Sequence, residues 1–249
     1  MSADVMNTTE WQLREPTVAF FDVNETLSDM SAMGACFERV GAPADLAATW
    51  FAALLRDGFA LAATDRMAPF ADIGAHTLRD LLGRRPLNRG RDDAVEEVMA
   101  GFLDLDVHGD VRTGIPRLGE LDIRLVTLSN GSASVAQGLL DRAGVLAHFE
   151  RCLSVEEAGV WKPSRRAYLY GLATCGVEAA EALLIAVHPW DIDGAARAGL
   201  QTAWINRTGA SYPAHFSKPT IEVRSLLDLA DRLRPPDATP RVGHADVLR

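Results

Sequence analysis

Residues 18–27 read VAFFDVNETL, and this stretch decides how the rest of the chain is interpreted. Its first four residues are apolar, as expected for a short buried strand, and Asp22 follows directly where the apolar run ends. Ligands of open α/β sheets bind at the carboxyl ends of the strands. We therefore expect Asp22 to lie in the functional site, with Thr26 four residues further on.

The composition is that of a globular protein, and its 249 residues suffice for one large domain or for a core with a smaller companion. A net charge of −9 provides no basic surface, so we expect no nucleic-acid partner. No apolar run approaches the roughly 20 residues of a membrane span, and we expect no signal peptide. Three dispersed cysteines without metal-ligand spacing are interpreted as reduced thiols, which favours a cytoplasmic protein. They are Cys36, Cys152 and Cys175.

Four short runs rich in Val, Ile, Leu or Ala are predicted as strands, with helical patterns between and after them. The predicted strands are 17–22, 123–128, 183–187 and 201–205, and the predicted helices are 133–143, 164–175, 193–198 and 224–233. Strands that alternate with helices predict an α/β fold, here a Rossmann-like parallel sheet with helices on both faces.

Residues 30–106 are rich in Ala and Leu, show helical periodicity and contain no convincing strand. A helical segment inserted after the first strand predicts a cap domain over the carboxyl edge of the sheet. The core domain is then expected to comprise residues 16–29 and 107–235. Residues 1–15 and 236–249 are expected to be flexible tails.

Four separated pieces each follow a predicted strand or open a loop. They are Asp22-Val23-Asn24-Glu25-Thr26, Leu128-Ser129-Asn130-Gly131, Trp161-Lys162-Pro163 with Tyr168 six residues on, and Trp190-Asp191-Ile192-Asp193-Gly194. Each piece alone is ordinary loop chemistry. Their order, with a helical segment between the first two, favours a single site assembled from four loops.

This order of pieces resembles the haloacid dehalogenase (HAD) superfamily, and within it the type II 2-haloacid dehalogenases. The resemblance covers about residues 17–233 and is closest at LSNGS (128–132), VWKP (160–163) and TAWINRTG (202–209). It implies a hydrolase in which Asp22 attacks the substrate carbon, expels the leaving group and forms an aspartyl ester that water then cleaves.

The resemblance also implies roles for other residues. Thr26 and Ser129 would donate hydrogen bonds to the nucleophile and to the substrate carboxylate, and Lys162 would keep Asp22 ionised. Asp191 would anchor Lys162 and help position the hydrolytic water. Tyr168 would orient Lys162 or close the pocket, and Asn130 would fix its loop or the substrate carboxylate. The candidates expected to bind substrate or to shape the pocket are Asn24, Glu25, Phe51, Asn130, Tyr168, His188 and Trp190.

A magnesium-dependent phosphatase is the alternative that the superfamily raises, because most of its members transfer phosphoryl groups. Such enzymes carry an Asp two residues after the nucleophile as general acid and base, where this chain has Asn24. They also carry a metal-binding acid four residues before the position of Asp191, where this chain has Val187. Valine supplies no oxygen ligand to a divalent cation, so we expect neither a metal nor another cofactor.

The chain departs from the type II dehalogenases in three places. An aromatic residue and a Gly of the family are replaced by Asn24 and Glu25, and a Ser and an Asn in the fourth piece by Ala186 and His188. The cap arginine that cradles the departing halide falls at Phe51. The sequence leaves open whether another arginine takes its place, such as Arg56 or Arg66, which are nearby in sequence.

The leading prediction is a metal-independent hydrolase that displaces the C2 leaving group of a small 2-substituted carboxylic acid. The alternative is a C–N hydrolase that opens a strained cyclic amino acid such as azetidine-2-carboxylate, because the loss of the cap arginine together with Glu25 beside the nucleophile favours a pocket that tolerates a cationic group. A non-catalytic binding module is a third hypothesis, which the intact set of candidate catalytic residues disfavours.

Family members are often homodimers, which is an expectation by analogy. Asp193 is expected at a helix N-terminus, and Arg207 is expected to tie down a loop.

Overall fold

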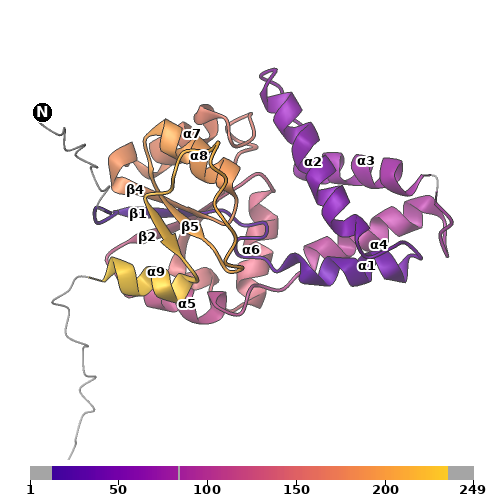
Figure 1. Cartoon of the computed structure of the whole chain (residues 1–249), viewed down its shortest axis with the longest axis horizontal. Coiled ribbons are helices and arrows are strands. Elements are labelled where there is room, and N and C mark those ends of the chain that lie inside the picture. The colour runs from indigo at the N-terminus through magenta and orange to yellow at the C-terminus, as the bar shows by residue number, and fades with distance from the viewer. Residues whose placement is uncertain (1–12, 84, 235–249) are drawn as a thin grey trace, which may run out of the picture.

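A computed structural model of the protein describes residues 13–83 and 85–234. Its centre is a six-stranded sheet in the order β3-β2-β1-β4-β5-β6, with every neighbouring pair parallel (Figure 1). The predicted α/β fold is therefore confirmed. The predicted tail 236–249 and most of the predicted tail 1–15 lie outside the described residues. The strands are β1 (Val18–Phe21), β2 (Arg124–Ser129), β3 (Phe149–Ser154), β4 (Ala182–Ala186), β5 (Gln201–Ile205) and β6 (Ile221–Val223).

β1 lies in the middle of the sheet, between β2 and β4, and all four of its residues are buried. A strand that is covered on both faces has no polar side, which is why its sequence is a continuous apolar run. Asp22 comes directly after β1, and its backbone N–H still donates to the carbonyl of Ile185 at the end of β4. The nucleophile candidate is thereby held at the carboxyl edge, where the chain changes direction.

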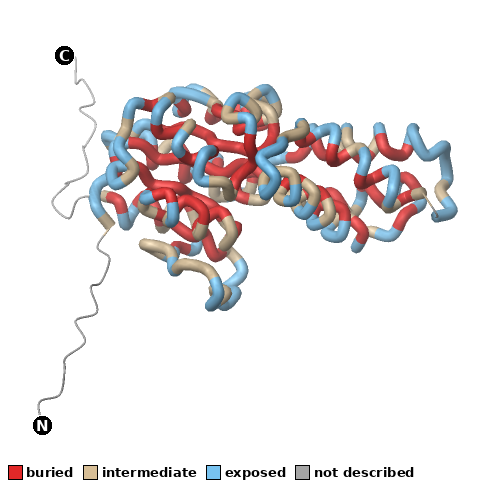
Figure 2. Tube along the Cα trace, turned by 90° about the horizontal axis from the view of Figure 1, so that it is seen from above, coloured by how far each residue is buried: buried red, intermediate tan, exposed pale blue. Residues whose placement is uncertain are grey.

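Helices cover both faces of the sheet, as predicted. The side chains of α7 (Arg165–Cys175) and α8 (Pro189–Ala198) join one buried cluster, together with alternate residues of β1 and β4. Those of α5 (Val111–Gly119), α6 (Ala133–Arg142) and α9 (Leu226–Leu233) join the cluster on the opposite face. Figure 2 shows the buried backbone concentrated in the layer between them. Short 3-10 helices are η1 (Met30–Ala32), η2 (Leu146–His148) and η3 (Ala179–Glu181).

Four elements of the core differ from the sequence prediction. β3 and β6 were not predicted, because β3 carries exposed charged residues as an edge strand and β6 has three residues only. α5 was not predicted either. α8 begins at Pro189 rather than at residue 193, with the proline in its first turn. Asp193 therefore lies inside α8, where it pairs with Arg197, and the prediction of a helix N-terminal position is wrong.

Residues 30–103 form the helical segment that projects to one side of the sheet in Figure 1. Its core is aromatic, because Trp50 packs edge-on against Phe102 at 5.7 Å and donates its indole N–H to the carbonyl of Gly74. The helices are α1 (Met33–Arg39), α2 (Leu46–Ala62), α3 (Phe70–Leu82) and α4 (Arg91–Leu103).

The helical segment packs on the sheet edge through Trp161. Its indole stacks on Phe70 at a centroid distance of 5.7 Å and donates to the carbonyl of Ala68. The two chain crossings between core and helical segment lie together, at an antiparallel bridge between Ser28 and Val107. These contacts place α2 against the loops that follow β1 and β4.

Within the described part of the chain, no helix combines the length and the apolar character that crossing a bilayer requires.

Candidate active site

Asp22 lies at the centre of the site with both carboxylate oxygens occupied. Lys162 Nζ donates to Oδ1 at 2.9 Å, and the Thr26 hydroxyl donates to Oδ2 at 2.6 Å. The Thr26 oxygen in turn accepts the backbone N–H of Val187 at 3.1 Å, which orients the hydroxyl towards Asp22. Thr26 belongs to the turn after β1, so the four-residue spacing seen in the sequence brings it back onto the carboxylate.

Lys162 is completely buried and lies between two carboxylates. Its Nζ donates to Asp191 at 2.6 Å as well as to Asp22. Burial by itself would lower the pKa of Lys162, but the charges of Asp191 and Asp22 outweigh burial and raise it. Burial by itself would likewise raise the pKa of Asp22, but Lys162, His188 and the hydrogen bonds outweigh it and lower that pKa. Asp22 is therefore an anion beside a cation.

Asp191 and Tyr168 form the buried end of this network. The Tyr168 hydroxyl donates to Asp191 Oδ1 at 2.6 Å, and both side chains are fully buried. Burial and the adjacent Asp191 raise the pKa of Tyr168 well above its ordinary value, so the phenol remains a donor. Tyr168 was expected to orient Lys162 or to close the pocket; it lines neither cavity described below, and it reaches Lys162 through Asp191. Its position on the inner face of α7 directs it at Asp191 instead.

Asn130 and Lys162 exchange hydrogen bonds through the Lys162 backbone. The Lys162 N–H donates to Asn130 Oδ1 at 2.8 Å, and Asn130 Nδ2 donates back to the Lys162 carbonyl at 3.3 Å. These contacts use one N–H and the oxygen of the Asn130 amide, and they join two loops. Of the two roles expected for Asn130, the structure places it in the loop-fixing one.

A small cavity of about 50 Å³ lies on the Ser129 side of the site. Its polar lining comes from Asn24, Ser129, Gly131, Ser132 and the acidic Glu156, and the rest includes apolar residues of α3 and α4. The Ser129 oxygen accepts the Gly131 N–H at 2.9 Å, which leaves its hydroxyl hydrogen available as a donor. Asn24 and Ser129 are therefore brought together, on one side of Asp22.

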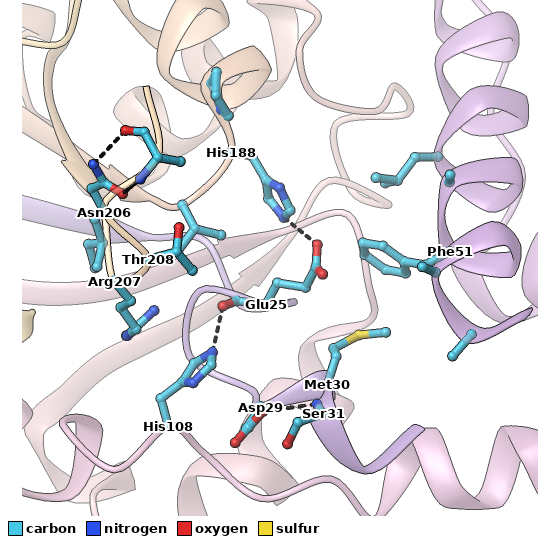
Figure 3. A pocket seen from close by; sticks show the side chains of 18 of the residues that line it. Glu25, Asp29, Met30, Ser31, Phe51, His108, His188, Asn206, Arg207 and Thr208 are labelled. Atoms are coloured by element: carbon cyan, nitrogen blue, oxygen red, sulfur yellow. Dashed lines mark hydrogen bonds and ion pairs between the residues drawn. The ribbon is translucent and has the colours of Figure 1, made fainter. Parts of the chain in front are cut away.

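A much larger cavity of about 910 Å³ opens on the other side, between α2 and the loops after β1, β4 and β5 (Figure 3). Glu25 and His188 line its core wall. Phe51 and Leu55 line its cap wall together with several alanines of the helical segment. The sheet loops thus supply most of the ionisable groups of this cavity, and α2 supplies an apolar surface with Asp45 at its N-terminal end.

His188 is held in place by two aromatic rings. Trp190 stacks on the imidazole at a centroid distance of 5.0 Å, and Phe51 stacks at 6.4 Å. His188 Nε2 lies 3.1 Å from the Asn24 carbonyl oxygen, 3.6 Å from Glu25 Oε2 and 3.7 Å from Asp22 Oδ2. Phe51, His188 and Trp190, which were predicted from separate pieces of sequence, therefore form one stack beside the carboxylate of Asp22.

Glu25 adopts a left-handed backbone conformation with φ of 61°. This conformation costs a residue with a Cβ roughly 1 kcal/mol, and local hydrogen bonds hold it. The Glu25 N–H donates to the Ser28 hydroxyl at 3.2 Å, and His108 Nε2 lies 2.9 Å from the Glu25 carbonyl oxygen. Burial raises the pKa of the Glu25 carboxyl, and Asp22 acts in the same direction against His188 and His108. The turn directs this side chain into the large cavity (Figure 3).

No arginine of the helical segment takes the place of Phe51 among the described residues. Arg56 is exposed and pairs with its neighbour Asp57, and Arg66 is exposed as well. The one arginine among the residues lining the large cavity is Arg207, and its guanidinium pairs with Asp110 at 3.0 Å.

The residues do not fit a hard divalent cation. Such an ion needs several oxygen ligands, and the described residues contain no group of three or more His, Cys, Asp or Glu arranged to hold one. Asp22 and Asp191 share the ammonium of Lys162. Asn24 lines the small cavity beside Ser129, and Val187 offers no side-chain oxygen. We derive no chemical step through a metal.

Two residues near the site were assigned no role in it from sequence. His108 supports the Glu25 turn, and only the bridge between Ser28 and Val107 brings it there. Arg207 was expected to tie down its own loop, but it also donates to the Thr26 carbonyl at 3.0 Å and so braces the nucleophile turn. No spacing in the sequence signals either contact.

Comparison with known proteins agrees with this arrangement. A family model described as haloacid dehalogenase-like hydrolase matches residues 16–199. Haloacetate dehalogenase H-2 of Moraxella sp. (strain B) is 28% identical over 205 residues, which is 82% of this chain and 91% of that protein. The (S)-2-haloacid dehalogenase of Pseudomonas sp. (strain YL) is 29% identical over 209 residues, covering 83% and 89% respectively.

Solved structures give the same result for the fold. One L-2-haloacid dehalogenase superimposes with a TM-score of 0.82 at 25% identity, over 88% of this chain and 99% of that chain. The L-2-haloacid dehalogenase from Xanthobacter autotrophicus has a TM-score of 0.75 at 22% identity, over 87% and 97%. Because the family model spans well over half of the sequence, the chain belongs to the haloacid dehalogenase-like hydrolases, as the sequence resemblance predicted.

Proposed function

We propose that this hydrolase displaces the leaving group at C2 of a small 2-substituted carboxylic acid through an aspartyl ester on Asp22. The observation that carries the proposal is the environment of Asp22, an anion held between Thr26 and the fully buried Lys162 at the end of β1. Each carboxylate oxygen keeps a second lone pair beyond its hydrogen bond, and such a lone pair can attack carbon without a metal. The names of the relatives, haloacetate and (S)-2-haloacid dehalogenases, support a halide among the leaving groups.

The first step joins an Asp22 oxygen to C2 of the substrate and breaks the bond to the leaving group, which departs on the opposite side. The Ser129 hydroxyl and the small cavity beside it suit the substrate carboxylate, because a hydroxyl hydrogen is available there. The large cavity lined by Glu25 and His188 then receives the leaving group. In the second step, water attacks the ester carbonyl, and Lys162 stabilises the carboxylate that is restored.

The experiment that tests the nucleophile is Asp22→Asn, with Asp231→Asn on the surface of α9 as the matched control. We expect Asp22→Asn to lose turnover of 2-chloropropionate by at least about 10³-fold, because an amide is a far weaker nucleophile. Wild-type protein turned over once in ¹⁸O-water should carry the heavy oxygen on the peptide that contains Asp22, as read by mass spectrometry. Turnover of Asp22→Asn at the wild-type rate would reject the proposal.

A second candidate, hydrolysis of a C–N bond in a strained cyclic amino acid, is favoured by the charges that line the large cavity. Glu25, Asp29 and Asp45 are acidic, whereas the guanidinium of Arg207 is paired with Asp110. This lining favours a cationic nitrogen over an anion. Incubation with 2-chloropropionate and with azetidine-2-carboxylate separates the candidates, and halide release without ring opening would reject the second one.

A further inference from the structure

Two ionisable side chains face the reacting atoms from the large cavity and have no part in the Asp22–Lys162–Asp191 network. His188 Nε2 lies 3.7 Å from Asp22 Oδ2 and 3.6 Å from Glu25 Oε2. Both His188 and Glu25 line the cavity, whereas Asp191 is completely buried with one oxygen bound to Lys162 and the other to Tyr168. The groups that water can reach beside Asp22 are therefore His188 and Glu25.

The contacts of His188 show which ring nitrogen carries a hydrogen. Nε2 faces the carbonyl oxygen of Asn24 at 3.1 Å and two carboxylate oxygens within 4 Å. A backbone carbonyl only accepts hydrogen bonds, so Nε2 is a donor in this arrangement. Stacking between Phe51 and Trp190 holds the ring so that Nε2 lies beside the Asn24 carbonyl, close to Asp22 and Glu25.

We propose that His188, positioned by Glu25, transfers protons in both steps, giving one to the leaving atom and taking one from the hydrolytic water. The inference rests on the proposed function, since it requires the ester on Asp22. It also names a substrate class: a 2-substituted carboxylic acid whose leaving atom is a nitrogen that takes up a proton as it departs. A halide needs no proton in the first step, so with such a substrate the imidazolium first releases its Nε2 hydrogen to the water of the cavity, and the neutral ring then takes a proton from the hydrolytic water in the second step.

The atoms balance over the two steps. In the first, the bond between an Asp22 oxygen and C2 forms, the C2–N bond breaks with its electron pair on nitrogen, and the Nε2 hydrogen of the imidazolium moves to nitrogen. In the second, water oxygen adds to Cγ of Asp22 while one water hydrogen returns to Nε2 of His188. The second water hydrogen leaves on the 2-hydroxy acid, and Asp22 is a carboxylate again. Such proton transfer contributes about 10²- to 10⁴-fold to a rate.

The surroundings of His188 support a proton-transfer role for it. The titratable groups that face it are Asp22 and Glu25, both from the turn after β1, and Lys162 lies beyond Asp22. α2 contributes the uncharged ring of Phe51, and α8 contributes that of Trp190. Glu25 is kept there by a strained turn, and burial raises the pKa of its carboxyl.

The test uses His188→Asn and Glu25→Gln in the full chain, with His76→Asn as a control on an exposed histidine of α3. With 2-chloropropionate, His188→Asn should release one halide per enzyme at close to the wild-type rate, and then turn over about 100-fold more slowly. The Asp22 ester should accumulate and be visible by mass spectrometry. With azetidine-2-carboxylate, the first step should slow by a similar factor. Glu25→Gln should slow turnover by about 10-fold and shift its pH profile.

The outcomes separate this inference from the proposed function. Turnover and ester levels of His188→Asn equal to wild type would overturn the inference and leave the nucleophile intact. Absence of any adduct on Asp22 in wild-type protein with either substrate would reject the proposed function, and the inference with it. His188→Gln keeps an amide donor for the Asn24 carbonyl but cannot titrate. It should reproduce the defect of His188→Asn at an unchanged melting temperature, and wild-type turnover in it would count against proton transfer.

Discussion

The two walls of the large cavity are built in different ways. The core wall is backed by side chains that hold one another through short hydrogen bonds, with Lys162 2.9 Å from Asp22 and 2.6 Å from Asp191. The cap wall presents Phe51, Leu55 and alanines, whose positions follow only from the packing of α2. The core wall can therefore specify the attacking group and present Glu25 and His188 to the leaving group, while the cap wall, free of such bonds, shapes the space into which that group departs.

The largest effect is expected when the cation of the core wall is removed. Lys162→Met should abolish turnover and cost about 3–5 kcal/mol of stability, because two buried carboxylates lose their partner. Without the cation, burial raises the folded-state pKa of both carboxyls above the unfolded values. The contribution of these carboxyls to the stability of the variant is then fully present below the unfolded pKa and is lost as pH rises. The loss of stability relative to wild type should therefore be smaller near pH 4 than at pH 7.

Urea unfolding at the two pH values measures this prediction. Lys218→Met is the matched control, since Lys218 is exposed and belongs to neither wall. The control should unfold as the wild type does at both pH values. A Lys162→Met protein with equal deficits at pH 4 and pH 7 would show that the ion pairs do not account for the stability of the core wall.

A smaller effect is expected where the cap helix meets the core. Gly58 of α2 lies against Trp161, and a Cβ at that position would overlap the indole ring. Gly58→Ala should destabilise the protein by about 1–3 kcal/mol, because the ring has to shift. Since Trp161 precedes Lys162, we also expect a higher KM. Thermal unfolding and steady-state kinetics measure both effects.

Gly138→Ala in α6 is the control for this substitution. Its Cβ would meet only the end of Arg142 at 3.4 Å, so helix propensity alone acts and the change should be neutral or stabilising by up to about 1 kcal/mol. If the two alanine variants behave alike, the fit of α2 on Trp161 does not matter for stability, and the cap wall is looser than the contacts indicate.

The core wall was predictable from sequence, and much of the cap wall was not. Asp22, Thr26, Lys162 and Asp191 each lie in or beside a loop that is recognisable from its neighbours. The carboxyl ends of parallel strands meet at one edge, which brings such loops together. The direction of Tyr168 could not be predicted, because its distance from Lys162 in sequence does not say which side of α7 faces Asp191.

The remaining features of the fold and the site depend on contacts between segments that are distant in sequence, which no local sequence pattern predicts. His108 reaches the Glu25 turn through a bridge between segments that the helical insertion separates by almost 80 positions in sequence. The edge strand β3 escaped prediction because Glu150 and Arg151 face solvent, so its apolar period is interrupted. The position of Phe51 was predicted, yet only its stacking on His188 shows that it lies in the cavity beside the reacting atoms.

The smallest expected effect comes from placing a charge on the cap wall. Phe51→Arg should bring a guanidinium opposite Glu25 and His188, where it stabilises a departing anion. We expect kcat/KM for 2-chloropropionate to rise by about tenfold relative to that for azetidine-2-carboxylate, which corresponds to about 1.4 kcal/mol. Phe51→Leu removes the ring without adding charge and should leave the ratio unchanged. If Phe51→Leu shifts the ratio as much as Phe51→Arg does, the cap wall selects the leaving group by shape, and its charge has no part in the selection.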